Sequence, residues 1–157
     1  MKKKKILSLI VCVLIPLAVG GLSAFLSREG FRDFALIEKP PLSPPAWVFP
    51  VVWTALYILM GVASWLVYTS AAPQPEKKKA LTLYGEQLFF NFFWSIIFFN
   101  LAAYYAAFLW LIALWVLILL TLISFWKIRR PAGWLLLPYI LWVTLAGYLN
   151  LGVALLN

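Results

Sequence analysis

Hydrophobic residues occur along the chain in long runs that short clusters of charged residues and prolines interrupt. A helix of about 20 residues crosses the roughly 30 Å hydrocarbon core of a bilayer, and most of these runs reach that length. The pattern therefore predicts membrane-spanning α-helices. The expected spans are residues 6–26, 47–70, 80–100, 105–126 and 132–156.

The connections between the spans follow from the same pattern. Residues 87–126 carry no charge and are about twice as long as one crossing needs, so the chain must turn within them. The small and polar residues Asn100–Tyr105 favour a tight hairpin there. Residues 27–46 carry mixed charges, and we interpret them as a lid-like loop. The expected fold is a single domain over residues 1–157, an all-α bundle of five transmembrane helices.

The first run has an alternative interpretation, because Lys2–Lys5 precede it as basic residues precede the apolar part of a signal peptide. The run is long enough to span a bilayer, and no small-residue cleavage site followed by a soluble domain appears, so we interpret it as a transmembrane helix. It also lacks the Arg- and Ser-rich character of a mitochondrial presequence. The expected location is a plasma membrane, crossed several times.

Composition and charge support this class. The 157 residues are 65% hydrophobic and 11% charged, with a mean hydropathy of +0.96, which leaves too little polar surface to coat a soluble globule. The formal charge of +8 does not indicate a nucleic-acid partner, because the basic residues lie in clusters between apolar runs. Lys2–Lys5, Lys77–Lys79 and the segment Lys127–Arg130 hold ten of the 13 basic residues. The positive-inside rule then predicts a cytoplasmic N-terminus and an external C-terminus.

The residue types present exclude most conventional catalysis. The chain has no histidine, one cysteine, no glycine-rich phosphate loop and no carboxylate cluster, so catalytic triads, metal-assisted hydrolysis and nucleotide binding lack their groups. No metal site is expected. Aromatic residues reach 18%, with nine tryptophans, which is more than interfacial belts require. Some of them should therefore line an internal surface.

Helical spacing indicates which side chains share a face, because residues four apart lie one above the other. The amide groups of the third-span stripe would be unsatisfied in lipid, so that face should point inward. The stripes are Trp53, Tyr57 and Gly61 in the second span, Gln87, Asn91, Trp94, Ser95 and Phe98 in the third, and Pro138, Trp142, Ala146 and Asn150 in the fifth.

Two interpretations of these stripes remain open. Flat aromatic walls with a few polar donors suit a large, planar, mostly apolar ligand. Alternatively the stripes only pack helices together, with Gly61, Ala146 and Gly147 allowing close approach and the polar side chains bonding between helices. Spacing alone favours the packing interpretation.

The chain resembles a known family, the translocator proteins, also called tryptophan-rich sensory proteins or peripheral benzodiazepine receptors. The resemblance extends over essentially the whole chain, and its motifs are specific in combination. They are KPPLSPPAWVFPVVWTALYILMG (Lys39–Gly61), QLFFNFFWSIIFF (Gln87–Phe99) and PYILWVTLAGYLNLGVALLN (Pro138–Asn157).

This resemblance, to a bacterial-type member, implies a five-helix bundle in the inner membrane of a bacterial cell. The bundle is commonly a homodimer, with a pocket that the first loop caps on the outer side of the membrane. Its ligands would be porphyrins such as protoporphyrin IX and drugs of the isoquinoline carboxamide or benzodiazepine type, in tetrapyrrole handling and stress signalling. Trp53 and Trp142 would be the pocket tryptophans, Asn91 a polar contact and Ala146 the small residue that sets pocket shape.

The proline-rich stretch before the second span would form the lid. Prolines such as Pro44 and Pro45 fix φ and would hold the loop extended over the bundle, while Trp47 anchors it at the interface. Alternatively the prolines only mark the start of a helix and Trp47 belongs to an interfacial belt. The family often has tryptophan where this chain has Leu42, which weakens the expected aromatic cover.

Sterol binding, known for animal members, is disfavoured because no basic residue follows Tyr148 to complete the sterol motif. A reversed sterol pattern exists in Lys79, Tyr84 and Leu88, but such patterns are common by chance.

The absence of histidine favours metal-free porphyrin over haem, and no obligatory cofactor is expected; any haem would be weakly ligated, by a tyrosine such as Tyr57. Three functions stay open. The first is a receptor or carrier for porphyrins and other hydrophobic small molecules, and the second is a light-dependent porphyrin-degrading enzyme with Trp53 and Trp142 as reactive neighbours. The third is a scaffold in membrane lipid that has no small-molecule ligand and whose aromatic residues are only structural.

Overall fold

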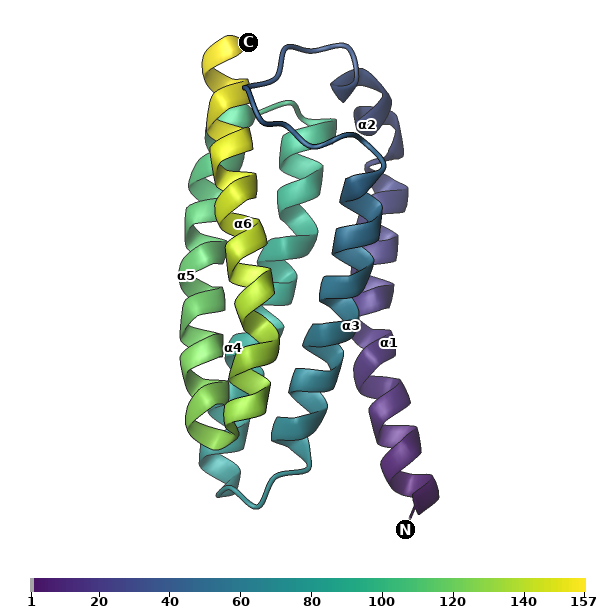
Figure 1. Cartoon of the computed structure of the whole chain (residues 1–157), viewed down its shortest axis with the longest axis vertical. Helices are drawn as coiled ribbons and strands as arrows, with labels where there is room; N and C mark the ends of the chain where they lie inside the picture. The colour runs from purple at the N-terminus through teal and green to yellow at the C-terminus, as the bar shows by residue number, and fades with distance from the viewer. Residues whose placement is uncertain (1) are drawn as a thin grey trace.

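The structure is a computed structural model that describes residues 2–157, and every regular element in them is a helix, as the sequence predicts. The long helices lie side by side along one axis, with the N-terminus at one end of the bundle and the C-terminus at the other (Figure 1). In chain order the elements are α1 (Lys2–Leu26), α2 (Arg28–Phe34), α3 (Val48–Tyr68), α4 (Gln74–Ser95), the π-helical turn η1 (Ile96–Asn100), α5 (Tyr104–Ile128) and α6 (Arg130–Leu156).

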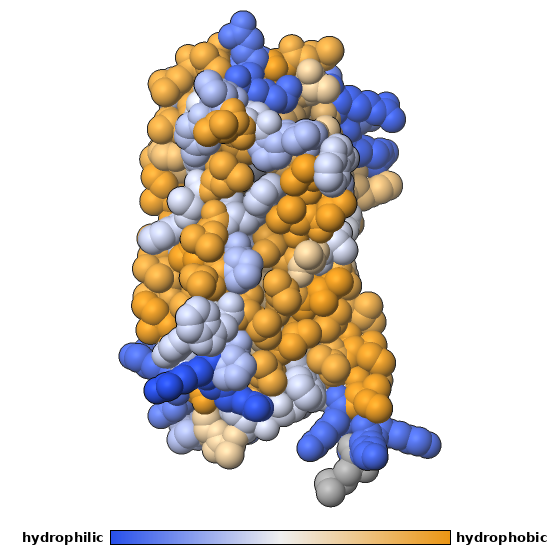
Figure 2. All heavy atoms as spheres, viewed as in Figure 1, coloured by the Kyte–Doolittle hydropathy of each residue, from blue (hydrophilic) through white to orange (hydrophobic). Residues whose placement is uncertain are grey.

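Four helices, α1, α3, α5 and α6, are long and apolar enough to cross a membrane. The fifth long helix, α4, is less apolar because Glu76, Lys77–Lys79 and Glu86 lie in it. Hydrophobic residues cover the middle of the face in Figure 2, and the most hydrophilic residues gather at its two ends. This distribution is that of a multi-pass membrane protein.

The lysine-rich segments continue the helices beyond the apolar runs, so α1 and α4 begin earlier than the expected spans, at Lys2 and Gln74. Proline lies in the first turn of α4 and of α6, where its missing N–H has no intrahelical partner to lose. We call the end of the bundle that holds Lys2–Lys5 the lysine end and the opposite end, which holds α2 and the C-terminus, the α2 end (Figure 1).

Two glycines let α1 and α3 approach closely. A Cβ added at Gly61 would lie 2.5 Å from Cα of Val13, so the α3 backbone rests against the α1 backbone. A Cβ at Gly20 would collide with the ring of Tyr57, so the ring fills the space that glycine leaves. Small residues have this role at helix contacts in membranes, where dispersion forces replace the hydrophobic effect.

At the α2 end, part of the expected loop 27–46 is helical. Helix α2 packs on η1, because Gly30 lies against the backbone of Phe99, where a side chain would not fit. The amide of Leu101 donates to the carbonyl of Ile96 (3.1 Å), which is the wider hydrogen-bond spacing of a π-turn. The turn to α5 then runs through Ala102, whose φ is 48°.

Candidate functional site

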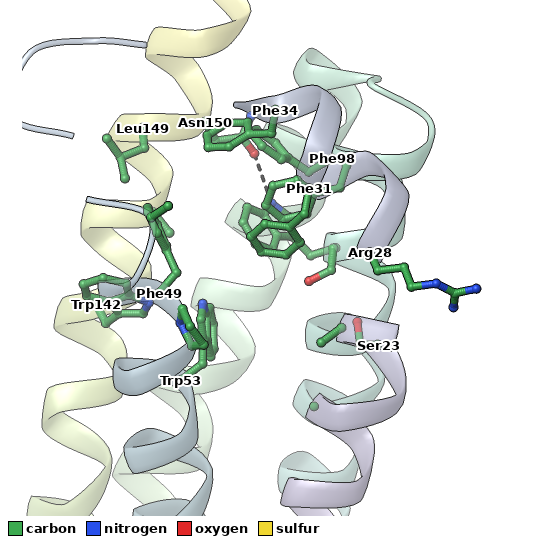
Figure 3. A pocket seen from close by; sticks show the side chains of 18 of the residues that line it. Ser23, Arg28, Phe31, Phe34, Phe49, Trp53, Phe98, Trp142, Leu149 and Asn150 are labelled. Atoms are coloured by element: carbon green, nitrogen blue, oxygen red, sulfur yellow. Dashed lines mark hydrogen bonds between the residues drawn. The ribbon is translucent and has the colours of Figure 1, made fainter. Parts of the chain in front are cut away.

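A cavity of about 380 Å³ lies below α2, between the halves of α1, α3, α4 and α6 nearest to the α2 end. Figure 3 shows it with Phe49, Trp53 and Trp142 on one side and Phe31, Phe34 and Phe98 on the other. We call it the aromatic cavity. Its lining also includes Gly20, Ser23, Arg28, Tyr57, Trp94, Phe99, Ala146, Leu149 and Asn150.

The α3 and α6 side of the cavity is built from indole and phenyl faces. Trp53 stacks on Tyr57 one turn along α3, with ring centroids 5.6 Å apart and an interplanar angle of 27°. Phe49, one turn in the other direction, meets Trp142 of α6 edge to face at 5.8 Å. Offset and edge-to-face pairs each stabilise by about 0.5–1.5 kcal/mol. These contacts hold the tryptophan rings in fixed orientations along the wall.

The roof of the cavity comes from α2 and η1. Phe31 stacks on Phe99 at 4.1 Å with the planes 17° apart, and Phe34 lies against both Phe98 and Phe99. The π-turn inserts an extra residue into the end of α4, and this brings the neighbouring Phe98 and Phe99 to line the cavity together.

Most polar groups of the lining are already hydrogen bonded. The Trp94 indole donates to Oδ1 of Asn150 (3.0 Å), and Nδ2 of Asn150 donates to the carbonyl of Tyr104 (2.8 Å). The hydroxyl of Ser23 donates to the carbonyl of Phe92 (2.8 Å). These bonds fix side chains and leave few groups free for a ligand.

The indole N–H of Trp142 is a buried polar group of the lining residues that lacks a partner in the described part of the chain. Nε1 is buried and has no hydrogen-bond partner within residues 2–157, although the ring lines the cavity. An unpaired buried donor costs about 1–3 kcal/mol, so a ligand that brings an acceptor to it recovers that cost. Arg28 is the charged residue of the lining, and its guanidinium extends away from the cavity, over the ring of Phe25 at 4.2 Å (Figure 3).

A layer of buried hydrogen bonds lies farther toward the lysine end. Tyr57 donates to Oδ1 of Asn91 (2.7 Å), Nδ2 of Asn91 donates to Tyr139 (2.7 Å), and Tyr139 donates to Oε1 of Gln87 (2.6 Å). Nε2 of Gln87 faces the sulfur of Met60 at 3.9 Å. This network joins α3, α4 and α6 and satisfies polar groups that lipid would leave unpaired.

The candidate residues from the sequence divide into two groups. Six of them line the aromatic cavity together: Trp53, Tyr57, Trp94, Trp142, Ala146 and Asn150. Gln87 and Asn91 are absent from its lining, because their amides belong to the buried network. Pro138 is exposed. An i, i+4 stripe turns by about 40° at each step on a helix of 3.6 residues per turn, so its distant members leave the face.

The proline-rich segment is fastened to the end of α6. The hydroxyl of Tyr148 donates to the carbonyl of Pro41 (2.7 Å), and Nδ2 of Asn157 donates to the carbonyl of Glu38 (2.8 Å). The ring of Pro40 occupies the space beside Gly152, where an added Cβ would lie 2.5 Å from Cγ. Three contacts along the segment thus hold it across the α2 end of the bundle.

The expected lid residues do not line the cavity. Pro44, Pro45 and Trp47 are absent from the lining, and Trp47 is 69% exposed. The segment contributes Ala46 instead, followed by Phe49 and Pro50 of α3. Leu42, where the family often has tryptophan, is 88% exposed with a φ of 67°, a left-handed conformation that is unfavourable for leucine.

Four lining aromatics are missing from the sequence-based candidates. Phe49 lies one turn before Trp53, so extending that stripe by four residues would have found it. Phe31 and Phe34 belong to α2, and Phe99 to the π-turn, and neither element is expected from the hydrophobic pattern. Residues 2–157 contain no group of three metal-ligating side chains.

Comparison with known proteins identifies the family. The TspO/MBR family matches residues 12–156. The chain is 37% identical to the tryptophan-rich protein TspO of Chlorobaculum tepidum over 98% of both chains. It is 35% identical to protein CrtK of Rhodobacter capsulatus over 88% of this chain and 85% of the relative, and 34% identical to the translocator protein of Bos taurus over 87% and 82%. The chain is therefore a member of the TspO/MBR family.

Proposed function

We propose that this protein is a membrane receptor or carrier that binds porphyrins of the protoporphyrin IX type in the aromatic cavity. The observation that supports this most is the juxtaposition of Trp53 and Trp142 with a buried indole N–H that lacks a partner. Flat rings along the walls favour stacking on a planar macrocycle. The free donor favours a ligand with an acceptor, which also includes the carbonyl of isoquinoline carboxamide or benzodiazepine drugs.

The macrocycle is proposed to bind without iron. The chain has no histidine, and the sulfur of Met60 faces Gln87 in the buried network, with the side chain fully buried. The hydroxyl of Tyr57 already donates to Asn91. Strong iron ligands are thus missing from the lining, and binding would depend on stacking and on the Trp142 donor.

The proposed topology has five spans, with α4 and η1 as the third. Residues 80–100 extend for about 30 Å at 1.5 Å per residue and carry Glu86 as their one charge. Lys2–Lys5, Lys77–Lys79 and the basic residues near Arg129 then lie at the lysine end, which the positive-inside rule places in the cytoplasm. The aromatic cavity would open toward the outer side of a bacterial inner membrane, and the protein would form a homodimer.

This topology can be tested in spheroplasts with single cysteines and a membrane-impermeant maleimide. In a Cys12→Ser background, Leu36→Cys is expected to react in intact spheroplasts and Lys78→Cys only after lysis. The reverse pattern would overturn the proposed orientation.

Light-dependent porphyrin breakdown is the second candidate function. It is favoured by the two indoles, Trp53 and Trp142, which line one cavity and would both be neighbours of a bound macrocycle.

Protoporphyrin IX titration of the detergent-purified protein, followed by tryptophan emission in the dark, tests the binding that both functions need. Saturable quenching supports the proposal, and linear quenching without saturation contradicts it. Illumination of the complex then separates the two, because only an enzyme converts the porphyrin into a product with a new absorbance.

A further inference from the structure

A second cavity, of about 600 Å³, lies in the half of the bundle nearest to the lysine end, between α1, α3 and α4. Figure 1 shows α1 leaning away from α3 toward its N-terminus. We call this the lysine-end cavity. It shares no lining residue with the aromatic cavity, so the proposed porphyrin site does not account for it.

The length of the lysine-end cavity matches one leaflet of a bilayer. Its lining on α1 extends from Lys4 to Ile15, which is about 16 Å at 1.5 Å per residue, or half of the roughly 30 Å hydrocarbon core. The wall consists mainly of aliphatic and aromatic side chains, such as Leu7, Val11 and Leu88. An acyl chain that lies along the membrane normal would fit these dimensions.

One polar group in the wall lacks a partner. Tyr84 is 6% exposed, and its hydroxyl has no hydrogen bond within the part of the chain that the structure describes. Ser64 and Ser8 use their hydroxyl protons within their own helices, since Ser64 donates to the carbonyl of Gly61 (2.8 Å) and Ser8 donates to the carbonyl of Lys5 (2.9 Å), and the fourth hydroxyl of the lining belongs to Tyr68, which is 57% exposed. A buried phenol without a partner gains most from an acceptor that the occupant brings.

The charge at the mouth is positive. Lys4 lines the cavity, Lys2, Lys3 and Lys5 belong to the same first turns of α1, and the lining contains no Asp or Glu. Lysines near a membrane surface attract anionic headgroups. The positive charge at the mouth, the phenol donor of Tyr84 and the apolar wall each complement one part of an anionic, ester-linked lipid. These parts are its headgroup, an ester carbonyl and an acyl chain.

We propose that the lysine-end cavity binds one anionic ester-linked lipid, with the headgroup at Lys4, an ester carbonyl accepting from Tyr84 and an acyl chain between Ile15 and Leu88. Tyr84 and Leu88 of the reversed sterol pattern line this cavity, but its basic member, Lys79, does not, and the lysine in the lining is Lys4 of α1.

Cys12 reports directly on occupancy. It is the sole cysteine of the chain, it is partly exposed, and it lines the cavity. We would measure the rate of its alkylation by N-ethylmaleimide, by intact mass, in detergent-purified and delipidated protein, while titrating dioleoyl phosphatidylglycerol or the zwitterionic dioleoyl phosphatidylcholine. The expected result is saturable protection by phosphatidylglycerol at a concentration at least about fivefold lower than by phosphatidylcholine.

Two variants test the individual contacts, with one matched control. Tyr84→Phe removes only the hydroxyl, and Lys4→Gln removes only the charge, and each is expected to weaken protection by phosphatidylglycerol about fivefold. Lys127→Gln changes a lysine in the last turn of α5 that does not line the cavity, and it should leave protection unchanged. Equal protection of Cys12 by both lipids would overturn the proposal. Better protection by protoporphyrin IX than by phosphatidylglycerol, or unchanged protection in Tyr84→Phe and Lys4→Gln, would also overturn it.

Discussion

The hydroxyl of Tyr57 donates to Oδ1 of Asn91 at 2.7 Å, and this bond joins α3 to α4 below the aromatic cavity. Asn91 uses its other amide atom to donate to Tyr139 (2.7 Å), so both of its polar atoms are occupied within the protein. The family resemblance implies that Asn91 contacts the ligand, but the geometry gives it a structural role. A porphyrin in the cavity would meet the ring of Tyr57 before it reached the amide.

This difference yields the first prediction. Asn91→Leu leaves two tyrosine hydroxyls without their partner, and we expect it to destabilise the protein by about 1–3 kcal/mol, because hydrogen bonds between membrane helices are worth about 0.6–1.7 kcal/mol each. The thermal midpoint in detergent should fall, while the Kd for protoporphyrin IX changes by less than about threefold. A tenfold weaker Kd with an unchanged midpoint would show that Asn91 contacts the ligand.

A second prediction concerns the contact between Gly20 and Tyr57. Gly20→Ala places a methyl group into the Tyr57 ring, which cannot move freely because it stacks on Trp53 and bonds to Asn91. Overpacking of this kind costs about 1–3 kcal/mol, so the thermal midpoint should fall. Gly21→Ala is the matched control, since nothing lies within 4 Å of its added Cβ. Equal midpoints for the two variants would contradict the described packing.

The unpaired indole N–H of Trp142 gives the third prediction. Trp142→Phe removes the unpaired N–H and keeps an aromatic ring, so we expect the thermal midpoint of the unliganded protein to change little. A ligand with a carbonyl or carboxylate acceptor should bind about fivefold more weakly, which corresponds to the loss of one hydrogen bond. Trp134→Phe, at a tryptophan 58% exposed on the same helix, serves as the control. Identical isotherms for Trp142→Phe and the wild type would argue against a ligand hydrogen bond at this indole.

How far the sequence alone leads can be judged from these residues. Spacing along the helices places Trp53, Tyr57, Trp142 and Ala146 on inward faces, because period and polarity are properties of one helix at a time. The same spacing cannot separate Asn91 from the ligand wall, since only the packed bundle shows which buried amides find partners in other helices.

The missing part of the site has a similar cause. The roof depends on a short helix with charged residues and on a π-turn, and Phe31 and Phe99 meet there only because Gly30 allows the two backbones to touch. Neither element has a hydrophobic period that a sequence reveals.

The fourth prediction concerns the lid segment. Tyr148→Phe removes the hydrogen bond to Pro41 while the bonds between Asn157 and Glu38 remain. The segment should open more often, so we expect the dissociation rate of bound protoporphyrin IX to rise about two- to fivefold. Stopped-flow recovery of tryptophan emission after dilution measures this rate. Tyr105→Phe, at an exposed tyrosine of α5, is the control, and an equal rate in both variants would mean that the segment does not gate the cavity.

The central claim is that porphyrin binds in the aromatic cavity, and filling this cavity tests it most directly. Ala146 lines the cavity and is 8% exposed, so Ala146→Phe projects a ring into the proposed binding space, whereas Ala106→Phe adds the same ring to an exposed position on α5. We would determine the Kd of protoporphyrin IX for both variants by tryptophan quenching, together with their circular dichroism spectra. The account predicts at least tenfold weaker binding for Ala146→Phe and wild-type binding for Ala106→Phe, with helical content unchanged in both. Wild-type affinity in Ala146→Phe would contradict it and would place the porphyrin elsewhere on the protein.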